Sequence, residues 1–279
     1  MARLVLAAKQ GEKRGVKKMS TNNIILEKSN QVATIRLNMP GSFNTLVDDL
    51  KVDLLKAVET CTDDSDTKAV IITGSGKAFC AGGDINLFKE SANTSDRLRQ
   101  GLKLVNLVIV GIRRMPKPVI AAINGVTGGA GVSIAAACDL RICASSVKFK
   151  TGYTSIGLVP DGGWTLLVPR LIGFGKAMEL LLLDSPFDAE QALQYGLVNK
   201  VVAPERLEEE SYAIARKLAE GPSVSYAIIK ENFNHAMYGL LERQLELERD
   251  GMIRAGRTAD SKEGFAAFLE KRKPRFTGK

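Results

Sequence analysis

The chain has 279 residues, of which 45% are hydrophobic and 25% are charged, so it is long enough for one large domain and is not disordered in composition. Part of its net charge of +8 comes from residues 1–18, which hold six basic residues against one acid. The other basic residues do not form the arginine-rich and aromatic clusters that favour nucleic-acid binding. We therefore expect no nucleic-acid partner, and we expect residues 1–18 to be a disordered basic tail.

The spacing of the four cysteines argues against a metal-binding protein and against a protein held together by disulfides. They are not spaced as metal ligands or as a disulfide framework, and no histidine lies near any of them. We therefore expect no metal site and a reducing, cytoplasmic location. The longest apolar stretch, Val119–Cys138, is interrupted by Asn124 and four glycines, so it predicts no membrane span. His235 is the single histidine, and any mechanism that needs an imidazole must use it.

Strand patterns alternate with helix patterns along the chain, which predicts an α/β core. Apolar side chains on the helices beyond Pro222 predict packing against this core or against a neighbouring subunit. The expected elements in chain order are a β-hairpin at 24–27 and 32–37, a helix through 46–58 capped by Asn44, a strand at 69–73, a helix at 98–114, a strand at 119–123, a small-residue helix to about 138, strands at 140–144 and 147–149, and helices from 163 with one strand at 198–202.

Two of the expected strands are each followed by a turn rich in small residues. The segment 78–85 reads AFCAGGDI, and the segment 124–131 reads NGVTGGAG. Small residues let backbone N–H groups face a ligand without an intervening side chain. Two such N–H groups that converge on one oxygen form an oxyanion hole. Tight turns and close helix packing are the alternative interpretation of each segment.

Three familiar motifs are only partly matched. The GSGK sequence at 74–77 lacks the first glycine of a phosphate loop and the Ser or Thr after Lys77. The segment 129–134 lacks the last glycine of a dinucleotide-binding turn. Ser133 stands in an incomplete nucleophile elbow, and His235 lies far away in the helical tail. We interpret Ser133 as a packing residue.

At this point the sequence resembles the enoyl-CoA hydratase/isomerase (crotonase) superfamily. The resemblance covers about residues 22–276, in family order and spacing. It implies a crotonase-like α/β spiral of β-β-α units in residues 19–215, followed by a helical trimerisation region at 216–279. The segments that carry it are FCAGGDI at 79–85, NGVTGGAG at 124–131, AAACDLRICA at 135–144, IGLVPD at 156–161, LVPRLIG at 167–173, DAEQALQYGLVNKVV at 188–202 and FAAFLEKRKPRF at 265–276.

The resemblance also implies the roles of individual residues. By position, Gly83 and Ala130 would donate the two N–H groups of an oxyanion hole. Coenzyme A would bend around residues 77–86 and meet the tail at Phe268 and Lys271. Coenzyme A is part of the substrate, so no separate cofactor is implied. The full set of implied substrate-binding residues is Lys77, Ala78, Ala81, Asp84, Ile85, Asn86, Gly129, Tyr153, Phe268 and Lys271.

The chain departs from the family pattern at the two catalytic glutamates of hydratases, which align with Ser133 and Tyr153. Asp161 is the one well-placed acid. Taken alone, it is typical of a helix N-cap. The arrangement IGLVPDGGWT resembles the 1,2-epoxyphenylacetyl-CoA isomerase branch, in which an aspartate at this position shuttles protons. Dehalogenases of the family need a histidine where this chain has Val110, so dehalogenation is disfavoured.

We therefore predict an enoyl-CoA isomerase in which Asp161 carries a proton between two carbons of the acyl chain. An unperturbed aspartate, with a pKa of about 3.9, is a weak base. Apolar walls, with Tyr153, Ile156 and Trp164 as candidates, would raise this pKa, whereas a helix N-terminus would lower it.

Three alternatives stay open at this point. They are a 2-enoyl-CoA hydratase, a thioester hydrolase that uses Ser133, and a non-catalytic acyl-CoA-binding subunit. The resemblance implies a homotrimer or a hexamer built as a dimer of trimers.

Overall fold

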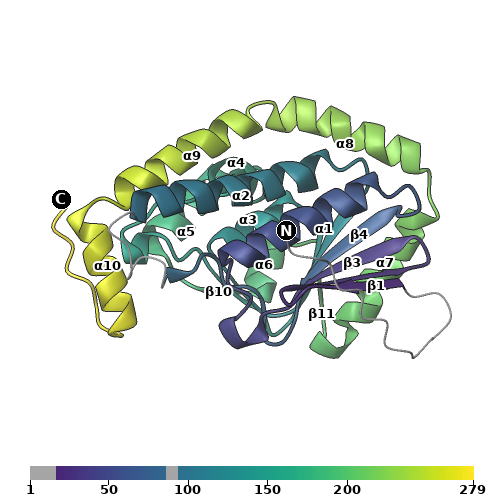
Figure 1. The fold of residues 1–279 in the computed structure, drawn as a ribbon. Coiled ribbons are helices and arrows are strands. Elements are labelled where there is room, and N and C mark those ends of the chain that lie inside the picture. The colour runs from purple at the N-terminus through teal and green to yellow at the C-terminus, as the bar shows by residue number, and fades with distance from the viewer. Residues whose placement is uncertain (1–16, 86–93) are drawn as a thin grey trace.

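The computed structural model describes residues 17–85 and 94–279. Its strands form two sheets, and helices surround them (Figure 1). Within the described ranges, no helix is both long enough and apolar enough to cross a membrane. The larger sheet contains, in spatial order, β1 (Lys17–Ser20), β2 (Ile24–Ser29), β3 (Val32–Leu37), β4 (Ala69–Gly74), β6 (Val119–Ile123), β8 (Leu140–Ala144) and β11 (Lys200–Val202). The smaller sheet contains β10 (Phe187–Asp188), β9 (Lys148–Lys150), β7 (Val126–Gly128) and β5 (Ala78–Cys80).

The chain winds as a spiral in which each turn supplies one strand to each sheet. β4 and β5 are followed by α2 (Thr94–Arg114), and β6 and β7 are followed by α3 (Ala130–Ala137). β4, β6 and β8 are parallel neighbours in the larger sheet, and β5, β7 and β9 are parallel neighbours in the smaller one. The predicted crotonase-like spiral of β-β-α units is therefore confirmed.

Helices cover both faces of the larger sheet. α1 (Asp48–Asp63) contacts β2, β3 and α2, whereas α7 (Leu207–Ala219) contacts β3, β4, β6 and β8. These two helices lie on opposite sides of the sheet in Figure 1. β4 and β6 are buried along their whole length, as expected for parallel strands that are covered on both faces.

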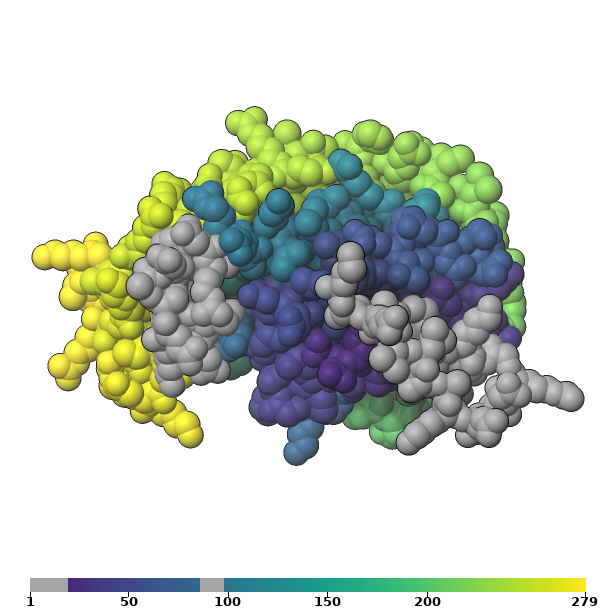
Figure 2. Space-filling view, in the orientation of Figure 1, coloured from purple at the N-terminus to yellow at the C-terminus, as the bar shows by residue number. Residues whose placement is uncertain are grey.

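The first helices after β9 complete the core, and the later ones pack over its outer helices. α4 (Trp164–Ile172), α5 (Phe174–Leu183) and α6 (Ala189–Tyr195) precede α7. α8 (Ser223–Tyr238) and α9 (Leu241–Ala255) then run back over α2, and α10 (Ala259–Leu269) packs on the short helix Thr154–Ile156. Figure 2 shows these last helices in green and yellow along one edge of the molecule. Leu241, Leu245 and Phe265 are buried, so α9 and α10 pack in part on the core of the same chain, which is one of the two outcomes that the sequence predicted, whereas the large apolar side chains of α8 stay exposed.

The structure corrects three expectations. Lys17 and Lys18 belong to β1, which pairs with β2, so the expected disordered tail is wrong at these two residues, and residues 1–16 lie outside the described part. Asn44 does not cap α1, which begins at Asp48; its buried amide instead binds the carbonyls of Ser75 and Ala78. The expected boundary between residues 215 and 216 falls inside α7, because that helix packs on the sheet.

Candidate active site

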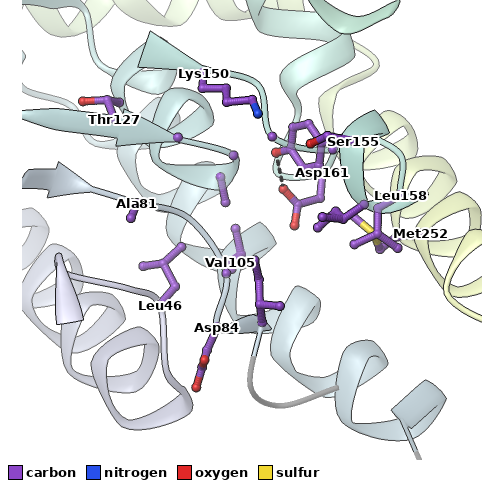
Figure 3. Close-up of a pocket in the computed structure, with 18 of the residues that line it drawn as sticks. Leu46, Ala81, Asp84, Val105, Thr127, Lys150, Ser155, Leu158, Asp161 and Met252 are labelled. Atoms are coloured by element: carbon purple, nitrogen blue, oxygen red, sulfur yellow. Dashed lines mark hydrogen bonds between the residues drawn. The ribbon is translucent and has the colours of Figure 1, made fainter. Parts of the chain in front are cut away.

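A cavity of about 340 Å³ lies where the two glycine-rich bends meet the loop that carries Asp161 (Figure 3). Most of its wall is apolar and comes from α2, from the bends and from the C-terminal helices. It contains nine of the predicted site residues, which lie on segments far apart in the sequence. These residues are Ala81, Gly83, Asp84, Ile85, Gly129, Ala130, Tyr153, Asp161 and Phe268.

The two bends touch each other through their glycines. A Cβ atom placed on Gly82 would lie 2.9 Å from the carbonyl oxygen of Gly128, which leaves no room for a side chain. Gly129 has φ 49° and ψ −129°, a backbone conformation that L side chains rarely adopt. It immediately precedes Ala130, the first residue of α3, whose N–H has no acceptor within the helix. The bends are thus built to bring main-chain groups to the cavity.

The carboxylate of Asp161 faces this cavity and is held from one side. The Tyr153 hydroxyl donates a hydrogen bond to Asp161 Oδ1 at 2.7 Å. The second carboxylate oxygen points away from Tyr153, toward the space between Val105 and Leu158 (Figure 3). Asp161 is 8% exposed, so the carboxylate is shielded from bulk water. One oxygen is therefore fixed by Tyr153, and the other faces the cavity.

Burial dominates the electrostatics of this carboxylate. Removal from water raises the pKa of Asp161 above its ordinary value, while the hydrogen bond from Tyr153 and the charge of Lys51 act in the opposite direction. The pKa of Tyr153 is raised well above its ordinary value by burial and by the neighbouring Asp161 charge. The phenol therefore stays protonated and remains the donor of the pair.

The N-cap interpretation of Asp161 is wrong. α4 begins at Trp164, its N-cap is Gly163, and no side chain caps it. The backbone carbonyl of Asp161 accepts a hydrogen bond from Ser133 Oγ at 2.8 Å and another from the Trp164 N–H at 3.2 Å. Its carboxylate takes part in neither bond. These bonds fix the Asp161 backbone and leave its carboxylate for the cavity.

Glu248 is a second buried acid beside this loop, and no sequence pattern points to it. It lies on α9 and accepts hydrogen bonds from the N–H groups of Gly163 at 2.6 Å and Thr165 at 2.9 Å, and from the Thr165 hydroxyl. Burial raises the pKa of Glu248 to about 7, with the charge of Asp161 adding to burial and these hydrogen bonds opposing it. The carboxylate thereby ties α9 to the start of α4. In the sequence it is one of several glutamates in a charged helix.

Several predicted residues lie outside the cavity wall. Lys77 and Lys271 are exposed, and Ala78 is buried in β5, where its carbonyl accepts a hydrogen bond from the Asn44 amide. Trp164 is buried in the core and does not line the cavity, which corrects its expected role as a wall, whereas the expected roles of Tyr153 and Ile156 as walls are confirmed. Asn86 lies outside the described residues.

The geometry of Ser133 and His235 bears on the hydrolase alternative. Ser133 is fully buried and donates its hydroxyl to the Asp161 carbonyl. His235, the single histidine, lies on α8 with its side chain 80% exposed, next to Glu231. Neither residue lines the cavity. The interpretation of Ser133 as a packing residue agrees with its position.

The fold and the cavity together define a crotonase-type acyl-CoA enzyme, and comparison with known proteins identifies the family. The profile of the enoyl-CoA hydratase/isomerase family matches residues 27–279. The 1,2-epoxyphenylacetyl-CoA isomerase of Escherichia coli strain K12 is 38% identical over 250 residues, which cover 89% of this chain and 95% of that protein. A crotonyl-CoA hydratase of Syntrophomonas wolfei is 38% identical over 262 residues, which cover 94% of this chain and 100% of that protein.

Solved structures agree with this result. The crystal structure of an enoyl-CoA hydratase from Mycobacterium avium subsp. paratuberculosis K-10 matches with a TM-score of 0.83 and 32% sequence identity, and it covers 91% of this chain and 98% of that one. This chain belongs to the enoyl-CoA hydratase/isomerase family. Both isomerases and hydratases occur among its relatives, so membership of the family does not by itself decide between the two reactions.

Proposed function

We propose that this enzyme shifts a carbon–carbon double bond of an enoyl-CoA, with Asp161 as the proton carrier. The observation that carries the proposal is a buried carboxylate in the same cavity as both glycine-rich bends. The similarity to 1,2-epoxyphenylacetyl-CoA isomerase of Escherichia coli supports an isomerase.

In the proposed reaction, the thioester carbonyl accepts hydrogen bonds from the N–H groups of Gly83 and Ala130. When an allylic proton leaves the acyl chain, its electron pair delocalises through the double bond to the thioester oxygen and forms a dienolate. Fixed N–H donors stabilise that negative charge without reorganising, and losing one donor costs about 3–4 kcal/mol in the transition state. One contact and one position support the placement of these donors: Gly82 packs against Gly128, and Ala130 is the first residue of α3.

Asp161 takes the proton on the oxygen that Tyr153 does not hold, and then returns it to the carbon at the other end of the conjugated system. The same proton leaves and returns, so one carboxylate suffices and no net charge or atom is lost. A positioned acid–base group contributes roughly 10²–10⁴-fold to the rate. The raised pKa of Asp161 supports this role, because it brings the base closer to neutral pH.

Coenzyme A enters this proposal as the carrier of the acyl chain. Ala81, Asp84, Ile85 and Phe268 line the cavity and would contact the thioester arm. Lys77, Lys271 and Asn86 remain proposed contacts, and the exposed side chains of the two lysines suit the charged phosphates of coenzyme A better than its apolar arm.

Hydration of a 2-enoyl-CoA is the second candidate, because crotonyl-CoA hydratase of Syntrophomonas wolfei is as similar in sequence as the isomerase. In family hydratases two glutamates handle water, and here Ser133 and Tyr153 stand at those positions. Both hydroxyls already donate to Asp161, so neither is positioned to deprotonate water. Asp161 would have to do this alone.

The two candidates are separated by their products. The enzyme is incubated with a 3-enoyl-CoA and, separately, with a 2-enoyl-CoA, and the same assays are run with Asp161→Ala and Asp161→Asn. Interconversion of the two enoyl-CoAs that falls by roughly 10²–10⁴-fold in both variants is the expected result. Hydroxyacyl-CoA as the main product identifies a hydratase. Tight acyl-CoA binding without any product contradicts both and identifies a binding subunit.

We also propose a homotrimer or a dimer of trimers. Large apolar side chains stay exposed on the outer helices, which favours burial in an assembly. They include Phe174, Leu182 and Leu183 on α5, and Val224, Ile228, Ile229 and Phe233 on α8. Light scattering coupled to size-exclusion chromatography should give three or six times the mass of 30.1 kDa, and a monomer would contradict the proposal.

A reducing, cytoplasmic location completes the proposal. All four cysteines are buried free thiols, which supports an environment that does not drive disulfide formation. Cell fractionation with antibodies to the protein tests this location directly.

A further inference from the structure

The apolar cavity contains one buried cation, Lys51, that the proposed chemistry does not use. Lys51 lies on α1, is 6% exposed and lines the cavity. Its ammonium donates a hydrogen bond to Asp48 Oδ1 at 2.8 Å. A lysine is almost never this buried without a specific reason, because removing the charge from water is costly.

The ammonium is seated in a notch between α1 and α2. A Cβ atom placed on Gly101 of α2 would lie 2.7 Å from Lys51 Nζ, so the absence of a side chain at Gly101 makes room for the charge. The neighbouring wall residues on the same helix, Leu98, Leu102 and Val105, are apolar. The cation is therefore set into an otherwise apolar surface.

The ion pair with Asp48 does not by itself explain this placement. The Asp48 side chain is 53% exposed, whereas that of Lys51 is 8% exposed. A pair with one partner in water contributes little to stability, and burying the ammonium carries the desolvation cost. An ammonium has three N–H donors, and within the described part of the chain Asp48 is the acceptor found for it. An acceptor that enters the cavity can use the remaining donor capacity.

Two other lysines line the cavity but differ from Lys51. Lys148 and Lys150 have side chains that are 66% and 49% exposed, and they pair with Asp188 and Asp184. These two lysines lie at the solvent-exposed rim of the cavity, where a charged group of the ligand can stay hydrated. The positive charge of Lys51 acts to lower the pKa of the Asp161 carboxyl and so opposes the rise that burial causes. Lys51 and the proposed proton carrier therefore share one cavity.

We propose that Lys51 is a specificity-determining residue, and that the acyl chain of the substrate carries an oxygen acceptor, in particular a carboxylate, beyond the reacting double bond. This inference rests on the proposed enoyl-CoA chemistry for its biological meaning. An acyl carboxylate would share the Lys51 ammonium with Asp48, whose exposed carboxylate can turn to water at little cost. A charge-assisted hydrogen bond in a site shielded from water would then distinguish this chain from a plain alkyl chain.

Binding of saturated acyl-CoAs tests this inference without turnover. Dissociation constants are measured by calorimetry for two matched pairs, hexanoyl-CoA with adipoyl-CoA and octanoyl-CoA with suberoyl-CoA. In the wild-type protein, at least one ω-carboxylated member should bind about 10- to 100-fold more tightly than its alkyl partner. Lys51→Met should remove this preference. Lys56→Met, at an exposed position on the same helix, should retain it.

A second variant reaches the ammonium without removing it. Gly101→Ala places a methyl group 2.7 Å from Lys51 Nζ, so the ammonium must shift, and the variant should lower the same binding preference. If wild-type protein binds both members of each pair equally, or if Lys51→Met keeps the preference, the inference is overturned. Selective binding without double-bond shift would leave the role of Lys51 intact and contradict the proposed function. A double-bond shift without selective binding would support the proposed function and overturn the role of Lys51.

Discussion

The Tyr153 hydroxyl donates to Asp161 Oδ1 at 2.7 Å, and both side chains are buried in the wall of the same cavity. The family resemblance implies that Tyr153 stands where hydratases have a glutamate, and in this structure that side chain is a hydrogen-bond partner of the aspartate. The hydrogen bond stabilises the charged form of Asp161 against the effect of burial. It also leaves the second carboxylate oxygen free for the proposed proton transfer.

Replacing Tyr153 by Phe should therefore move the pH dependence of activity. Loss of the hydroxyl removes an interaction that lowers the pKa of Asp161, so that pKa rises further. Asp161 must be ionised to accept a proton, and the acid limb of kcat/KM should shift to higher pH. On the plateau, the loss of one neutral hydrogen bond should cost at most about tenfold. The profile is measured with a 3-enoyl-CoA between pH 4 and 9, and a limb that stays in place or moves to lower pH contradicts the role of Tyr153.

Replacing Ser133 by Ala should affect stability more than catalysis. The variant loses a buried hydrogen bond to the Asp161 carbonyl, which should lower the free energy of unfolding by about 1 kcal/mol. The Trp164 N–H still holds that carbonyl, so kcat/KM should change only a few-fold. Urea unfolding and steady-state rates check the two expectations. Abolished activity in a fully folded variant would support the nucleophile interpretation that we reject.

Replacing Gly129 by Ala should damage the proposed oxyanion hole. The backbone conformation at Gly129 strains an alanine by about 1–3 kcal/mol, and relief of that strain would displace the Ala130 N–H. If the donor is lost, kcat should fall by about 10²–10³-fold. Gly173, at φ 80° with no atom near its missing Cβ and outside the cavity, is the matched control. Gly173→Ala should reduce stability and retain activity; equal losses of activity in both variants would argue against a special role of Gly129.

Replacing Glu248 by Gln should change how stability depends on pH. Burial raises the pKa of Glu248 from 4.5 to about 7, so the folded state retains this proton more strongly than the unfolded state does. The stabilisation linked to the neutral acid is complete below about pH 4.5 and is lost as the pH rises through about 7. The difference corresponds to at most about 3 kcal/mol.

The stability of the wild type relative to Glu248→Gln should therefore fall between pH 5 and pH 8 and then level off. Chemical unfolding at several pH values measures this difference. Glu246→Gln, which removes a half-exposed carboxylate on the same helix, is the control and should give no comparable trend. A difference that rises with pH would show that the hydrogen bonds from Gly163 and Thr165 outweigh burial.

The sequence predicted which segments form the site better than it predicted which residues those segments contact. The apolar runs of β4 and β6 and the small residues after them placed both bends correctly, because strand burial and glycine turns are local properties. Asn44 was misplaced as a cap, because an asparagine before a helix also suits a buried turn, and only the packed loop shows that its amide binds Ser75 and Ala78. Asp161 is the candidate acid in the sequence, but only the folded loop shows that its side chain does not cap α4.

By itself, the sequence determined the α/β class and the two glycine-rich bends, because periodicity and glycine content are written along the chain. The order of its motifs also carries the family resemblance, which implied the spiral and made Asp161 the candidate proton carrier. The tertiary structure alone decided which groups surround that aspartate. Glu248 reaches Gly163 across 85 positions of sequence, and Lys51 meets Gly101 through the packing of α1 on α2. Such contacts depend on how helices pack against one another, and an amphipathic pattern shows that a helix face is buried without showing what it is buried against.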